Sequence, residues 1–146
     1  MTDGQDPRLG RWPMAIDVRV AWGEMDAFKH LNNVIYVRYM ESARIAYFER
    51  TGLPLDGLER GPILVSQTVH YRRAVLYPDT LSVAVTTIKL GNTSFVNGYR
   101  MVNGKGELVC EGESTGVWFD YKLGAKVPLD DAFRAAIYGL EAKAKG

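Results

Sequence analysis

Residues 26–33 hold the side chains whose types and spacing could do chemistry. Asp26, His30, Asn32 and Asn33 place one carboxylate, one imidazole and two carboxamides within eight residues. A carboxylate beside a carbonyl group can attack it directly or take a proton from water. Asparagines that open a helix accept hydrogen bonds from its unpaired N–H groups, and this end of a helix favours an anion or a polarised carbonyl oxygen. The run is therefore our candidate site for chemistry at a carbonyl group.

Two elements must position this run. Residues 16–20 alternate between apolar and charged side chains, which predicts a strand that ends just before it. Residues 34–50 contain neither Gly nor Pro and predict a helix that begins beside it. Gly52 suits a left-handed C-cap, and Glu41 and Arg44 are spaced to pair on the helix surface. The expected buried stripe of this helix comprises Val37, Met40, Ala43, Ala46, Tyr47 and Phe48.

The rest of the chain is rich in strand signals. Segments 64–72, 81–86, 93–102 and 108–119 predict four strands, with turns at 77–79, 91–92 and 103–106. A short helix is expected at 129–143. The economical arrangement is an α+β fold, in which one long central helix is wrapped by a curled antiparallel sheet of about five strands. We expect residues 1–13 to form a loose N-terminal tail and residues 14–146 to form a single domain.

The composition limits the possible partners. The formal net charge is +1, so no overall field favours nucleic acid or an anionic membrane. Cys110 is the only cysteine, which rules out an intrachain disulfide and a metal site with paired cysteine ligands, and His30 and His70 lack metal-ligand spacing. The N-terminal residues are polar, and no apolar stretch approaches the length of a membrane span. We therefore expect a cytoplasmic protein that uses neither a metal nor a cofactor.

Several positions together form a family pattern. They are Asp26, the run His30-x-Asn32-Asn33-x-x-Tyr36, Glu41, Arg44 and the segments 69–73, 77–79 and 91–95. In this pattern, which covers about residues 16–119, the chain resembles the hotdog-fold acyl-CoA thioesterases, specifically the 4-hydroxybenzoyl-CoA thioesterase-like group. The resemblance implies a hotdog fold and the hydrolysis of an acyl-CoA thioester to a free acid and CoA.

The resemblance also implies roles for the site residues. Asp26 corresponds to the catalytic carboxylate, acting as nucleophile or general base, and the backbone N–H near Asn33 corresponds to the group that polarises the thioester carbonyl. His30 is a catalytic candidate that would orient Asp26 or the substrate, and a hydrogen bond to the loop backbone is its alternative role. Asn32 and Tyr36 are candidate substrate-binding residues, with helix capping for Asn32 and core or interface packing for Tyr36 as the alternatives.

The implied partner is an acyl-CoA bound at an interface between copies of the chain. We therefore expect a homodimer or homotetramer whose sheets join edge to edge. Because the protein has almost no net charge, local basic side chains must attract the phosphates of CoA. Arg72 and Arg73 are the candidates, with Lys89 and Arg100 behind them, and a solvated surface role is the alternative for all four.

Two other functions remain open for the same residues. A hotdog-fold hydratase or dehydratase also uses an acidic residue and a histidine near the helix, although Ala27-Phe28-Lys29 lacks the closely placed Asp, Asn and Pro expected before that histidine. Turnover of an enoyl-CoA would favour this reaction. A non-catalytic acyl-CoA-binding protein would instead bind acyl-CoA tightly without turnover, and the presence of Asp26 argues against it.

Overall fold

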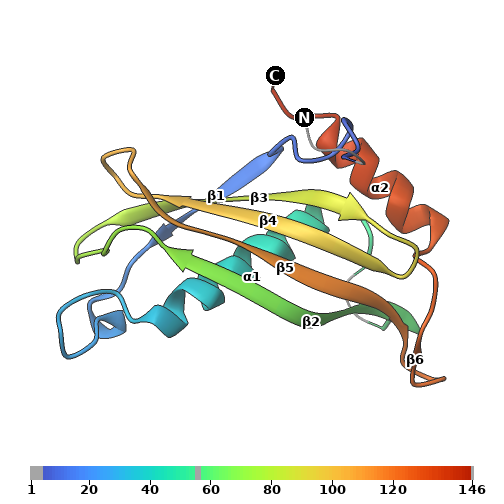
Figure 1. Ribbon diagram of the computed structural model, residues 1–146, viewed down its shortest axis with the longest axis horizontal. Coiled ribbons are helices and arrows are strands. Elements are labelled where there is room, and N and C mark those ends of the chain that lie inside the picture. Colours follow the sequence, from blue (N-terminus) through green and yellow to red (C-terminus); the bar gives the residue numbers. More distant parts are fainter. Residues whose placement is uncertain (1–4, 55–56, 146) are drawn as a thin grey trace.

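The computed structural model describes residues 5–54 and 57–145. Within these residues the helices and strands follow in the predicted order, and Figure 1 shows the long helix lying across one face of the sheet. The elements are β1 (Met14–Arg19), the short 3-10 helix η1 (Trp22–Glu24), α1 (Asn33–Arg50), β2 (Arg60–Tyr71), β3 (Thr80–Leu90), β4 (Ser94–Val102), β5 (Leu108–Asp120), β6 (Ala125–Lys126) and α2 (Asp131–Glu141).

The sheet is antiparallel throughout. Its strand order is β1-β3-β4-β5-β2, and the two-residue β6 pairs with β5. The predicted hotdog fold is confirmed, with β6 added to the expected strands. Strand β2 lies at an edge, because it pairs with β5 on one side and with no other strand of the described chain. An unpaired edge of this length exposes a row of backbone N–H and C=O groups.

The helix α1 turns a bulky face toward the sheet. Its buried residues are Tyr36, Tyr39, Met40, Ala43, Tyr47 and Phe48. The prediction for Val37 was wrong, because Tyr36 and Tyr39 face the sheet and leave 36% of Val37 exposed. The expected pair between Glu41 and Arg44 was also wrong, since Arg44 Nη1 instead donates to Tyr99 Oη at 3.0 Å.

The end of α1 follows the sequence closely. The helix ends at Arg50, and Gly52 has a φ of +80°, the left-handed conformation predicted for a residue just after a helix.

Both α-helices of the described chain are too short or too polar to cross a membrane.

The buried carboxylate of Glu141 joins α2 to the rest of the core. It accepts hydrogen bonds from Tyr47 Oη (2.7 Å), from Thr86 Oγ1 (2.6 Å), and from the N–H groups of Thr87 (3.2 Å) and Arg11 (2.9 Å). Among the described residues no cation lies within ion-pair distance of it. Four donors thus replace the water that a carboxylate loses on burial. The two helices, β3 and the N-terminal segment meet at this one group.

The N-terminal segment from Gln5 onward is packed rather than loose, so that prediction was wrong for its described part. Leu9 is buried, and the Gly10 N–H donates to the Thr87 carbonyl at 2.8 Å. The N–H groups of Arg11 and Trp12 donate to Glu141 and to Thr86 Oγ1. The Gly, Pro and Arg content suggested a tail, but acceptors distant in the sequence bind this backbone.

Candidate active site

A short closed loop between β1 and α1 carries Asp26, at the lower left of Figure 1. A bridge between Met25 and Leu31 closes its base. The Asp26 N–H donates to the His30 carbonyl at 2.8 Å, and the Asp26 carbonyl accepts from the Lys29 N–H at 3.0 Å. Lys29 has a φ of +65°, the left-handed conformation that lets the chain reverse within so few residues. The backbone of the loop therefore fixes where the carboxylate lies.

The Asp26 carboxylate is half-buried and partly used by its own loop. Its Oδ1 accepts from the Phe28 N–H at 2.9 Å and, at 3.4 Å, from the His30 N–H. Its Oδ2 has no hydrogen-bond partner within the described chain. A carboxylate oxygen left in this state can take a proton or attack an electrophile.

The start of α1 follows the loop directly. Asn32 is the N-cap, and its Oδ1 accepts from the Val34 N–H at 3.1 Å, which confirms the predicted cap. Asn33 is the first helical residue, and its N–H meets no acceptor in the part of the chain that the structure describes. One N–H at the positive end of the helix dipole thus remains unused beside the loop.

Three residues that sequence reasoning missed hold this region in place. Tyr39 Oη donates to Glu24 Oε1, which also accepts from the Ala21 N–H at 2.7 Å. Tyr71 Oη donates to the Asn33 carbonyl at 3.0 Å, and its ring meets Tyr36 edge-on at 5.0 Å between centroids. The helical spacing of Tyr36 and Tyr39 could have indicated that both face the sheet, whereas the contacts of Glu24 and Tyr71 depend on tertiary structure.

Tyr36 is nearly inaccessible to solvent. Burial raises the pKa of its hydroxyl to about 12, so the hydroxyl stays protonated well into the alkaline range. Five predicted residues lie around the loop and the first turn of α1, namely Asp26, His30, Asn32, Asn33 and Tyr36. The backbone of His30 bonds to Asp26, while its imidazole is exposed and has no hydrogen-bond partner within the described residues. The predicted alternative, a hydrogen bond between His30 and the loop backbone, is formed by the His30 carbonyl, which accepts from the Asp26 N–H, and not by the imidazole.

Arg72 and Arg73 lie just beyond the end of β2, in a segment that touches the loop. The Leu31 N–H donates to the Val75 carbonyl at 2.9 Å, which joins the two segments. Arg72 pairs with Glu111 at 3.0 Å, and Arg73 pairs with Glu107 at 3.3 Å. Both guanidinium groups remain about half exposed, so a phosphate would compete with these carboxylates for them.

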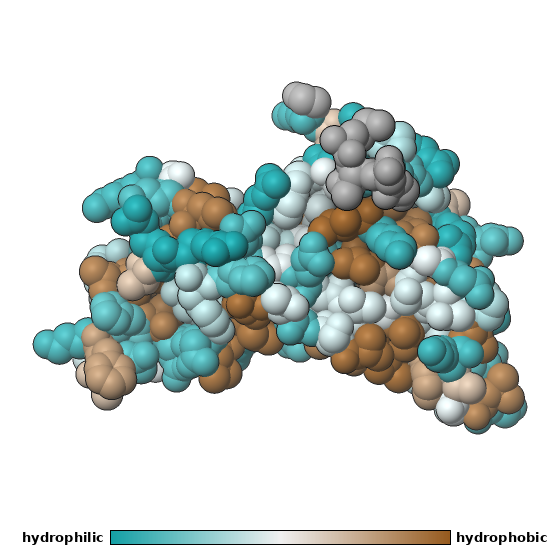
Figure 2. Space-filling view, viewed as in Figure 1, coloured by the Kyte–Doolittle hydropathy of each residue, from teal (hydrophilic) through white to brown (hydrophobic). Residues whose placement is uncertain are grey.

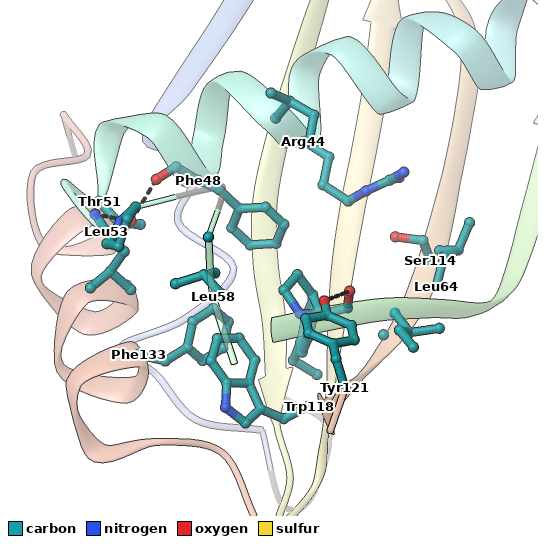
Figure 3. A pocket seen from close by; sticks show the side chains of 17 residues that line it. Arg44, Phe48, Thr51, Leu53, Leu58, Leu64, Ser114, Trp118, Tyr121 and Phe133 are labelled. Carbon is teal, nitrogen blue, oxygen red and sulfur yellow. Dashed lines mark hydrogen bonds between the residues drawn. The ribbon is translucent and has the colours of Figure 1, made fainter. Parts of the chain in front are cut away.

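A separate apolar cavity of about 410 Å³ lies toward the other end of α1 (Figure 3). It lies between the second half of α1, the start of β2, strands β4 and β5, and α2. Its walls are mainly aromatic and aliphatic, and Arg44 is the single charged side chain among its described lining residues. The aromatic part of the wall comprises Phe48, Phe95, Trp118, Tyr121 and Phe133.

Residues 20–137 match the family model described as the thioesterase-like superfamily. This chain belongs to the thioesterase-like superfamily. The match covers the loop, both helices except the end of α2, and all strands after β1.

Solved structures and a curated protein are similar to this chain. A thioesterase from Thermus thermophilus, solved with coenzyme A and Zn, is 31% identical, with 91% of this chain and 97% of that chain covered and a TM-score of 0.81. A DHNA-CoA thioesterase from Staphylococcus aureus is 20% identical over 88% and 90% of the two chains, with a TM-score of 0.79, and shares the fold. The Bacillus subtilis protein YsmA is 32% identical over 90 residues, which are 62% of this chain and 61% of that protein.

This member of the thioesterase-like superfamily also contains a Gly-x-Ser-x-Gly spacing that the sequence analysis overlooked. In α/β-hydrolases such a run forms a sharp turn from strand to helix that exposes a nucleophilic serine. Here the run from Gly112 to Gly116 lies inside β5, and the buried Ser114 Oγ is hydrogen-bonded to Tyr99 Oη at 2.7 Å. The glycines have a packing cause, because a Cβ would meet the Thr68 carbonyl at Gly112 and the Phe95 ring at Gly116.

Cys110 in this superfamily member is fully buried, and burial raises the pKa of its thiol to about 12. We expect a thiol reagent at about pH 8 to leave the native protein unlabelled, because the reactive thiolate is both scarce and shielded. The same reagent in denaturant should label one thiol per chain, which provides the control. Rapid labelling of the native protein would contradict this account.

The described residues also contain no group of three His, Cys, Asp or Glu side chains placed to hold a metal ion.

Proposed function

We propose that the protein hydrolyses an acyl-CoA thioester to a free acid and CoA. The observation that carries the proposal is that two unused groups lie close together in the sequence. The Asp26 carboxylate, with Oδ2 unbonded within the described chain, lies in the short loop that leads into α1, and the first N–H of that helix, at Asn33, has no acceptor among the described residues. Thioester hydrolysis needs both a base or nucleophile and a donor for the developing oxyanion. Membership of the thioesterase-like superfamily and the Thermus thioesterase solved with coenzyme A support the same reaction.

The reaction follows from these two groups. The thioester carbonyl oxygen accepts a hydrogen bond from the Asn33 N–H, which stabilises the negative charge that develops there. Asp26 takes a proton from water as the water oxygen attacks the carbonyl carbon. The C–S bond then breaks, CoA leaves as its thiolate and is protonated, and the acid is released. In the nucleophilic version Asp26 attacks the carbon itself, the C–S bond breaks and the CoA thiolate leaves and is protonated, and water then hydrolyses the resulting anhydride to release the acid and restore Asp26.

The other predicted residues take supporting roles in this proposal. His30 holds the loop through its backbone, Asn32 caps the helix that supplies the donor, and Tyr36 packs beneath the site. Arg72 and Arg73 attract the phosphates of CoA from the neighbouring segment, where they exchange their present carboxylate partners for phosphate. In this proposal the protein acts on acyl-CoA in the cytoplasm.

A panel of short, medium, long and aromatic acyl-CoAs, with detection of the released thiol, tests the proposed activity. At least one member should be hydrolysed with saturation kinetics and release one thiol per acid formed. An enoyl-CoA measured in parallel separates hydrolysis from hydration. Failure of the whole panel, or turnover of the enoyl-CoA alone, would refute the assignment.

The active assembly in this proposal is at least a homodimer joined through β2. Hydrophobic side chains reach the surface on and near this strand (Figure 2), and Val65 on β2 and Ile45 on α1 are 55% and 42% exposed. Exposed apolar residues beside an unpaired strand edge favour a partner of the same kind. Two β2 strands paired antiparallel about their centre would place Tyr71 of one chain opposite Arg60 of the other.

Val65→Glu should therefore shift the protein toward the monomer. The change places two carboxylates close together near the centre of the proposed β2 pair, where like charges oppose association. Light scattering at fixed micromolar concentration measures the mass, and Leu123→Glu, at an exposed apolar residue in the turn after β5, is the matched control. An unchanged oligomeric mass for Val65→Glu, or a stable monomer in the unmodified protein, would rule out this interface.

A further inference from the structure

The cavity contains one cation that lacks a charged partner. Arg44 is half-buried and reaches from α1 toward Ser114, as Figure 3 shows. Its one hydrogen bond goes to Tyr99 Oη at 3.0 Å, and Tyr99 Oη is in turn bonded to Ser114 Oγ at 2.7 Å. No carboxylate of the described chain lies within ion-pair distance of it. A guanidinium group has five N–H donors, so most of its donors remain unused.

We propose that this cavity binds the acyl group of the substrate, and that Arg44 binds a carboxylate carried at the far end of that group. The proposal rests on the thioesterase activity proposed above and adds the class of substrate. The preferred substrate is then a CoA thioester of a dicarboxylic acid, with an apolar body between the thioester and the free carboxylate.

The chemistry of the cavity favours a carboxylate over a neutral end group. A partly buried charge is stabilised by an opposite charge that also satisfies its hydrogen-bonding groups. The planar guanidinium fork fits a carboxylate with two parallel hydrogen bonds. Tyr99 and Ser114 hold Arg44 in place as neutral groups, so they orient the cation without neutralising it. The surrounding aromatic wall suits the apolar body of the same acyl group.

In the proposed β2 pair, the cavity of one chain lies nearer along the strand to the Asp26 loop of the other chain than to its own. Along α1, Asn33 and Arg44 are about 16 Å apart. Tyr71, at the end of β2 that contacts Asn33, is about 26 Å along the strand from Ile63, which lines the cavity of the same chain. Antiparallel pairing of two β2 edges about their centre shortens that separation to about 10 Å along the strand between Ile63 and the partner's Tyr71. An acyl group of ordinary length can span this gap.

The test compares two pairs of acyl-CoAs that differ only at the end of the chain, adipoyl-CoA against hexanoyl-CoA and suberyl-CoA against octanoyl-CoA. We expect the unmodified protein to prefer the carboxylated member of at least one pair by about tenfold or more in kcat/KM. In Arg44→Met the ratio should fall to about one. Arg38→Met, at an exposed arginine earlier on the same helix, should keep the ratio of the unmodified protein.

Binding measurements separate this inference from the proposed activity. Titration calorimetry on Asp26→Asn protein should show the carboxylated acyl-CoA bound about tenfold more tightly than its neutral counterpart, since the charge pair affects binding before any chemistry. Equal affinities would overturn the inference even if both thioesters are hydrolysed by the unmodified protein. A clear binding preference without turnover in the unmodified protein would keep the inference and refute the thioesterase activity.

Two further variants cover the case in which Arg44→Met does not fold. Arg44→Lys keeps the charge but removes the fork, and Tyr99→Phe removes the hydroxyl that orients Arg44. Both should lower the preference for the carboxylated substrate to an intermediate ratio. If folded variants lose activity on both members of a pair equally, Arg44 has a structural or interface role and the inference is wrong.

Discussion

Asp26→Asn should lower kcat for acyl-CoA hydrolysis by about a hundredfold or more, the scale expected for a positioned acid–base or nucleophilic group. The substitution retains an oxygen that can accept from the Phe28 and His30 N–H groups, so the loop should keep its shape. It removes the negative charge and the basic oxygen. Steady-state kinetics with the best substrate of the acyl-CoA panel gives the measurement.

Asp17→Asn is the matched control for this change. Asp17 is an exposed aspartate on β1, outside the loop, and its substitution should leave kcat within about twofold of the unmodified protein. Circular dichroism and the oligomeric mass must be the same in both variants. A correctly folded Asp26→Asn protein with nearly normal kcat would remove Asp26 from the mechanism.

Glu141→Ala should lower the free energy of unfolding by about 3 kcal/mol or more. The change leaves the hydroxyls of Tyr47 and Thr86 and two backbone N–H groups without their common acceptor in the core. Each buried donor left unpaired carries a desolvation penalty of about 1–3 kcal/mol. Urea unfolding at one fixed protein concentration should show a lower midpoint with an unchanged slope.

Two comparisons make this expectation specific. Tyr47→Phe removes one of the four donors and should cost about 1 kcal/mol. Glu49→Ala, at an exposed glutamate on α1, should change the free energy of unfolding by about 0.5 kcal/mol at most. Equal midpoints for Glu141→Ala and Glu49→Ala would show that the buried network contributes little.

The fold was accessible from the sequence because its signals are local. Alternating side chains predicted the strands, the absence of Gly and Pro predicted α1, and Gly52 marked its end. The loop from Asp26 to Asn33 was recognisable for the same reason, since its polar groups lie within eight residues. The predicted Asn32 cap depends on a hydrogen bond only two residues long, to Val34.

The errors concern contacts between distant parts of the chain. The N-terminal segment packs because Glu141 and Thr87, far along the sequence, supply its acceptors. Arg44 donates a hydrogen bond to Tyr99 on β4 and does not pair with Glu41 on its own helix. Helical spacing cannot reveal this contact. The spacing of Gly112, Ser114 and Gly116 acquires its meaning from Thr68 and Phe95, which pack against the two glycines.

The left-handed backbone of Lys29 sets a limit on stability engineering near the site. A residue other than glycine in this conformation is strained by about 1 kcal/mol, and glycine would relieve that strain. Glycine would also give the closed loop more conformations, so the Asp26 carboxylate would spend less time in the position that the proposed mechanism requires. Under the proposed mechanism, a Lys29→Gly variant selected only for heat resistance would therefore gain stability and lose part of its turnover.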